Sequence, residues 1–127
     1  MRAAIVSLVG IALCGSVIAA QSASDLARGD AAKGKAVYAA RKCATCHRTD
    51  KADAKGGKLS TILGDTVGKL SPADLKKWLT DTAAMEAGLP KPPVAKMSAF
   101  IKNLKPALTE ADVANLVAYL RTLPAKS

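Results

Sequence analysis

Residues 41–50 read RKCATCHRTD and contain two cysteines, Cys43 and Cys46, with a histidine directly after the second. His47 is the only histidine of the chain, and the one further cysteine, Cys14, lies far upstream. A zinc site normally needs four ligands, and this cluster offers fewer. A thioredoxin-like dithiol would lie beside alternating strands and helices, a pattern that this sequence lacks. Cys-x-x-Cys-His is instead the signal for covalent attachment of a c-type haem.

The motif predicts that Cys43 and Cys46 hold the haem as thioethers and that His47 is one axial ligand of the iron. Because the chain has no second histidine, methionine is the expected partner, and a His/Met pair raises the haem potential. Met85 falls at the end of an expected helix, where filling the core is its plainer role. Met97 follows prolines that exclude a helix. We therefore expect Met97, on a non-helical segment, to be the second axial ligand.

The first twenty residues have the composition of a secretory signal peptide. Arg2 precedes the uncharged run AAIVSLVGIALCGSVIAA, which passes into small and polar residues. We expect residues 1–20 to be cleaved on export to the periplasm, leaving residues 21–127 as a single domain with its core at about 30–123. A retained membrane anchor is the alternative, since the run is about long enough to span a bilayer.

Helical signals dominate the rest of the chain. Residues 30–41 begin with an acid and end with basic residues, which suits a helix dipole. Ser71, Pro72 and Asp74 are typical of a helix start, and this helix is expected to end near Thr82. No segment alternates with a period of two residues. We therefore predict an all-α fold of about four short helices, with a long loop over residues 48–70.

The last helix has the clearest pattern. Thr109 and Asp112 form a capping box, and apolar residues then recur at helical spacing until Pro124 ends the helix. These apolar residues are Val113, Leu116, Val117 and Leu120.

From about residue 30 to residue 123 the chain resembles a small class I cytochrome c. The matching pieces are GKAVY (34–38), CATCH (43–47), LSPADLKKWL (70–79), MSAF (97–100) and LTEADVANLVAYLRTL (108–123). The resemblance implies a cytochrome c fold wrapped around one covalently bound haem c, with His/Met ligation. It also implies that the first and last helices cross, with Gly34 and Tyr38 against Leu116 and Tyr119.

The resemblance extends to the loop after the haem motif, with one departure. The family commonly has Gly-Pro-x-Leu there, and the proline carbonyl accepts a hydrogen bond from the haem-ligating histidine. Here the nearest match is Gly56-Gly57-Lys58-Leu59, so the Gly57 carbonyl is the candidate partner of His47 and Leu59 a candidate haem contact. Trp78 could donate its indole N–H to a haem propionate or could simply pack on the apolar face of its helix.

The formal net charge of +9 bears on partners. Lysines and arginines flank both the haem motif and Met97, which predicts a basic surface that steers the protein to redox partners with acidic docking surfaces. A basic surface that serves only solubility is the alternative. Nucleic acid is not expected as a partner of an exported chain with so few aromatic residues, and membrane contact is expected only if the leader is retained.

We expect a carrier of single electrons between redox proteins, with no catalytic residues of its own. One alternative is the cytochrome subunit of a periplasmic dehydrogenase, such as the small haem subunit of molybdenum sulfite dehydrogenases. A less favoured alternative is a haem enzyme or gas sensor with an open iron position, which would require that Met97 does not coordinate.

Overall fold

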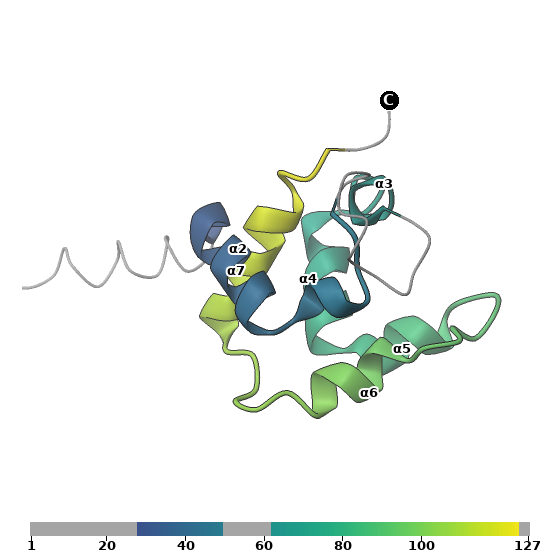
Figure 1. Ribbon diagram of the computed structural model, residues 1–127. Helices are drawn as coiled ribbons and strands as arrows, with labels where there is room; N and C mark the ends of the chain where they lie inside the picture. Colours follow the sequence, from purple (N-terminus) through teal and green to yellow (C-terminus); the bar gives the residue numbers. More distant parts are fainter. Residues whose placement is uncertain (1–27, 50–61, 125–127) are drawn as a thin grey trace, which may run out of the picture.

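The computed structural model describes residues 28–49 and 62–124 (Figure 1). Within these ranges it contains no β-strand, only an isolated bridge between Arg48 and Ile62. The all-α class is therefore confirmed, with more helices than the four expected. No helix in this part of the chain is both long and apolar enough to cross a membrane. The elements are α2 (Ala31–Ala40), a short 3-10 helix (Cys43–Thr45), α3 (Leu63–Val67), α4 (Pro72–Thr80), α5 (Thr82–Ala87), α6 (Met97–Lys102) and α7 (Glu110–Leu120).

The crossing of α2 on α7 is the closest helix contact of the fold, and Figure 1 shows the two helices against each other. A Cβ atom on Gly34 would lie 1.9 Å from the Asn115 carbonyl oxygen and 2.7 Å from the Tyr119 Cβ, so only glycine fits. One turn on, the Tyr38 ring meets the Tyr119 ring edge-on at a centroid distance of 5.5 Å. Leu116 beside them is only 2% exposed. The predicted crossing is confirmed.

The caps of the long helices follow from the sequence. The Asp30 carboxylate accepts hydrogen bonds from the amides of Ala32 and Lys33 at the start of α2. Ser71 with Asp74, and Thr109 with Asp112, form reciprocal capping boxes at the starts of α4 and α7. Each cap satisfies backbone N–H groups that have no partner inside the helix.

The buried apolar core is small. It comprises side chains from α2, α3, α4 and α7 that pack into one cluster: Tyr38, Val67, Leu75, Leu79, Val113, Leu116 and Leu120. So few buried side chains leave much of the apolar surface of the helices to be covered by something else.

Two loop predictions are corrected. The stretch 48–70 contains α3, and Met97 is the first residue of α6 rather than part of a non-helical segment. The prolines exclude a helix only as far as residue 93, and α6 starts beyond them. Met85 lies in α5 rather than in the helix that carries Trp78, because the backbone at Asp81 (φ −133°, ψ 49°) leaves the helical region and separates α4 from α5.

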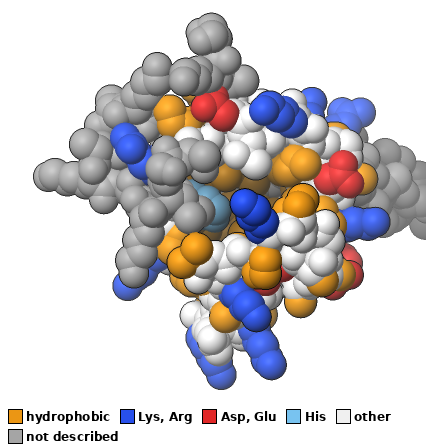
Figure 2. All heavy atoms as spheres, turned by 90° about the vertical axis from the view of Figure 1, so that its right-hand side faces the viewer, with side chains coloured by type: hydrophobic (Ala, Val, Ile, Leu, Met, Phe, Trp, Pro, Cys, Tyr) orange, Lys and Arg blue, Asp and Glu red, His pale blue; other side chains and the backbone are white. Residues whose placement is uncertain are grey.

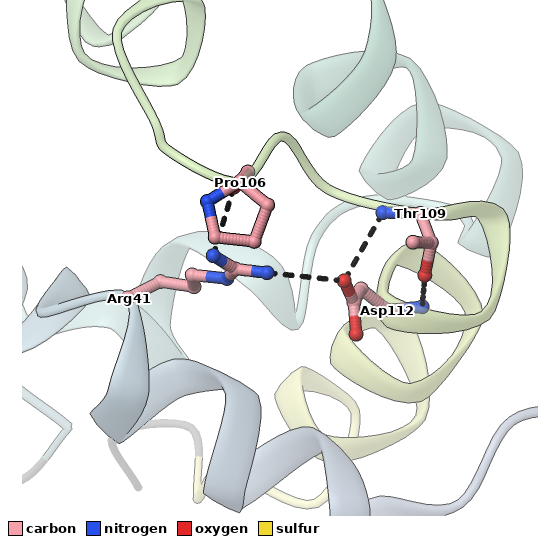
Figure 3. Close-up of polar contacts among 4 residues, drawn as sticks. All are labelled: Arg41, Pro106, Thr109 and Asp112. Atoms are coloured by element: carbon pink, nitrogen blue, oxygen red, sulfur yellow. Dashed lines mark hydrogen bonds and ion pairs between the residues drawn. The ribbon is translucent and has the colours of Figure 1, made fainter.

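A polar cluster joins the end of α2 to the start of α7 (Figure 3). Arg41, directly after α2, donates to the Pro106 carbonyl at 2.8 Å and pairs with the Asp112 carboxylate at 3.5 Å. The same Asp112 oxygen accepts the Thr109 amide at 3.1 Å. Arg41, two residues before the haem motif, therefore connects the end of α2 with the α6–α7 connection and the cap of α7.

Replacing Gly34 with alanine should lower the free energy of unfolding by about 1–3 kcal/mol, because the new methyl group meets backbone rather than a movable side chain. The matched control is Gly88→Ala, where the new Cβ lies 3.6 Å from its nearest neighbour, the Met85 carbonyl oxygen. That variant should keep or slightly gain stability. Denaturant unfolding of the holoprotein measures both; equal stability of the two variants would contradict the tight crossing.

The Asp112 cap should make stability depend on pH. Hydrogen bonding to Thr109 lowers the pKa of the Asp112 carboxyl, so its stabilisation is present above the unfolded pKa and is lost as pH falls through the folded pKa. Asp112→Asn should therefore lower the urea midpoint at pH 7, and its difference from the parent should shrink towards pH 2. Asp81→Asn is the control, since the Asp81 side chain caps no amide of α5. A difference that does not change with pH would be the contrary result.

Candidate functional site

A cavity of about 640 Å³ lies among the helices, and each of the six α-helices in the described part of the chain contributes to its lining. Its walls are mainly aliphatic and aromatic, and its size is that of a cofactor pocket. Figure 2 shows the one histidine, in pale blue, at the edge of a hollow surrounded by hydrophobic side chains. The lining includes all but two of the predicted site residues: Cys43, Cys46, His47, Trp78 and Met97.

The backbone of the Cys-x-x-Cys-His motif folds into one tight turn. Lys42, with φ 56°, adopts the left-handed conformation and starts the 3-10 helix. The amides of Cys46 and His47 both donate to the Cys43 carbonyl, at 3.2 and 3.0 Å. This turn brings both sulfurs and the imidazole to the same cavity. The two thiols are half-buried and are not bonded to each other.

Burial in the cavity favours the uncharged forms of two side chains of the motif, His47 and Cys43. Desolvation lowers the pKa of His47, which favours the neutral imidazole, the form that can coordinate a metal. Desolvation also raises the pKa of the Cys43 thiol, the largest of several influences on that group. Both shifts have the same physical cause, because an apolar cavity disfavours charge.

Tyr38 has a role at the site that the sequence did not reveal. Its hydroxyl donates to the His47 carbonyl at 2.8 Å, while its ring is 6% exposed in the crossing of α2 and α7. Tyr38 therefore packs in the helix crossing, as predicted, and also holds the backbone of His47. Its contact connects the helix crossing directly to the backbone of the candidate iron ligand.

Two methionines, not one, line the cavity. Met85 reaches it from α5 and Met97 from the first residue of α6, and both are half-buried. Met97 also packs against the buried core cluster. The cavity therefore contains a thioether in addition to the predicted one, and Met85 is part of the site rather than only of the core.

A contact between α5 and α6 lies beside both methionines. The Glu86 carboxylate accepts the Ser98 amide at 3.0 Å and the Ser98 hydroxyl at 2.5 Å. The two residues are 12 positions apart, with the proline-rich connection between them. No helical or turn spacing pairs them, so sequence reasoning missed them both.

Trp78 lies in α4 between the buried residues Leu75 and Leu79 and is itself half-buried on the cavity wall. Its packing role is therefore realised, and its hydrogen bond to a haem propionate stays a prediction. Its carbonyl accepts the Thr82 hydroxyl at 2.7 Å, which holds the start of α5 against α4.

Gly57 and Leu59 lie outside the described residues, so the proposed partner of His47 stays a prediction. The residues on either side of that stretch are close together. The Leu63 amide donates to the Arg48 carbonyl at 2.7 Å, which ties the end of the haem motif to the start of α3. Across residues 28–49 and 62–124, no three His, Cys, Asp or Glu side chains gather as a metal-binding cluster.

The cavity fits a haem in size and apolar character, and it brings the two cysteines of the attachment motif to one wall. The cytochrome c family model matches residues 31–124. No curated protein and no solved structure matches the chain closely enough to be compared with it. The chain belongs to the cytochrome c family, and it is a haem-binding electron-transfer protein whose haem c is attached covalently through Cys43 and Cys46.

Proposed function

We propose that this protein carries single electrons between redox proteins in the periplasm, with the haem iron held between His47 and Met97. The observation that supports this most is the single apolar cavity that both side chains line together with the two cysteines. If His47 and Met97 both bound the iron, no coordination position would remain for a substrate, which suits electron transfer rather than catalysis. The leader-like composition of residues 1–20 supports the periplasmic location.

The haem supplies an iron that changes between the ferrous and ferric states. The residues around the haem would limit the structural rearrangement that accompanies this change of oxidation state. Tyr38 holds the His47 backbone through its 2.8 Å hydrogen bond, and the apolar lining excludes water from the iron. The Met97 thioether favours the ferrous state and so raises the potential. Little has to move when the charge of the iron changes, and that favours rapid transfer.

The rim of the cavity supports docking of another protein. Lys42 and Lys96 both line the cavity and are exposed. Leu89 is 40% exposed and Phe100 37%, and both also line the cavity. An apolar edge beside lysines suits a redox partner with an apolar patch flanked by carboxylates. Val94 is fully exposed in the proline-rich connection, which gives some support to the alternative of a dehydrogenase subunit.

Met97→Ala should remove the His/Met spectrum of the oxidised holoprotein, lower its reduction potential and open the ferrous iron to carbon monoxide. Met85→Ala is the matched control, because it removes the other cavity thioether and should leave ligation unchanged. Absorption spectra with and without carbon monoxide measure both. A spectrum that changes in Met85→Ala and not in Met97→Ala would reverse the assignment. Rapid carbon monoxide binding by the parent would favour the open-site enzyme or sensor.

Lys42→Glu should slow oxidation of the ferrous protein by the ferricyanide anion by about tenfold at low salt, because it reverses a charge at the cavity rim. Oxidation by a cationic cobalt phenanthroline complex should become faster, and both effects should fade at high salt. Lys76→Glu makes the same change of charge on α4 at a residue that does not line the cavity, so its effect should be much smaller. Equal effects of the two variants would contradict electron exchange through this rim.

A further inference from the structure

Helix α6 begins at the candidate ligand Met97 but has no cap of its own. Its N-cap residue, Lys96, has an extended backbone and makes no capping hydrogen bond, and a lysine side chain has no acceptor to offer. The first amides of a helix need acceptors from elsewhere. Glu86 of α5 provides one, since its carboxylate oxygens accept the Ser98 amide at 3.0 Å and the Ser98 hydroxyl at 2.5 Å.

The position of α6 depends on α5. With six residues, α6 is far shorter than the helices that are stable alone in water. The helix that it packs against most is α5, and the Glu86–Ser98 contact joins the two across the proline-rich connection. A shift of this contact would therefore move the first turn of α6 as a unit.

The contact is next to both cavity methionines in sequence. Glu86 follows Met85, and Ser98 follows Met97. The amide that donates to Glu86 is part of the peptide group that joins Met97 to Ser98, so the bond restrains the Met97 backbone directly. Two donors of the same residue, the Ser98 amide and the Ser98 hydroxyl, converge on this one carboxylate, and hydrogen bonds to a carboxylate acceptor are the stronger kind.

We propose that Glu86 is a positioning residue for the axial methionine: by capping α6 from α5, its carboxylate holds the Met97 backbone where the thioether reaches the iron. This inference rests on the proposed His/Met ligation. Glu86 itself touches neither the haem nor the iron; it acts through Ser98. The strength of the bond between the iron and the Met97 sulfur then depends partly on Glu86, a carboxylate on a different helix.

The test uses the ferric holoprotein and added imidazole, which competes with methionine for the iron. Glu86→Ala should raise the affinity for imidazole by about tenfold or more, the effect of losing a hydrogen bond to a charged group. Its reduction potential should fall as methionine ligation weakens. Ser98→Ala keeps the hydrogen bond from the backbone amide to Glu86 and loses only the one from the hydroxyl, so its effect should be intermediate. Glu86→Gln keeps an acceptor and should restore part of the parental behaviour.

Asp74→Ala is the matched control. Asp74 accepts the Ser71 hydroxyl at 2.6 Å and the Ser71 amide at 3.4 Å in the cap of α4, so it is a similar carboxylate cap on a helix that carries no candidate ligand. It should lower overall stability and leave imidazole affinity at the parental value. This comparison separates positioning of the ligand from a general loss of stability.

Two outcomes would overturn the proposal, and they differ. If the parent shows methionine ligation and the Glu86 and Ser98 variants bind imidazole as the parent does, the positioning role is wrong and the proposed function stands. If the parent spectrum lacks methionine ligation, both the positioning role and the proposed ligand set are wrong. If Glu86→Ala does not fold, the imidazole affinities of Ser98→Ala and Glu86→Gln test the positioning role in the same way.

Discussion

The close approach of α2 to α7 at Gly34 is the constraint on which the rest of the structure depends. The missing side chain lets two backbones meet, and the Tyr38 and Tyr119 rings then pack one turn further along. From that crossing, Tyr38 reaches the His47 carbonyl, and Arg41 reaches the α6–α7 connection and the α7 cap. The helix pair thus positions the haem motif through the Tyr38 contact, while Arg41 holds the α6–α7 connection and the α7 cap against the end of α2.

The two sides of the cavity are held in different ways. On one side the motif is a compact turn directly after α2, close to the helix crossing and joined to the haem by covalent bonds. On the other side, α5 and α6 are short helices joined by a proline-rich connection, and a carboxylate–serine contact holds them together. The cysteine side of the cavity is therefore fixed by covalent bonds, whereas the side that carries Met85 and Met97 is held by non-covalent contacts alone.

Much of this arrangement could be predicted from local sequence. The Thr109–Asp112 capping box, the helix start at Ser71 and the Gly34–Tyr38 spacing are short-range signals, and the structure has each of them as expected. What could not be predicted depends on tertiary contact: the break between α4 and α5 at Asp81, the start of α6 at Met97, and the pairing of Glu86 with Ser98. The prolines before Met97 suggested extended backbone, but α6 takes its cap from a different helix, which no local pattern can show.

The small buried core has a consequence for how the chain folds. Six of the seven buried apolar side chains of the described residues also line the cavity of about 640 Å³, so most of the core faces the space that the haem would fill. Without the haem, the helices would bury little apolar surface against one another. Their packing would therefore offset little of the conformational entropy that folding costs. Full packing of the helices around the cavity would then depend on attachment of the haem through Cys43 and Cys46.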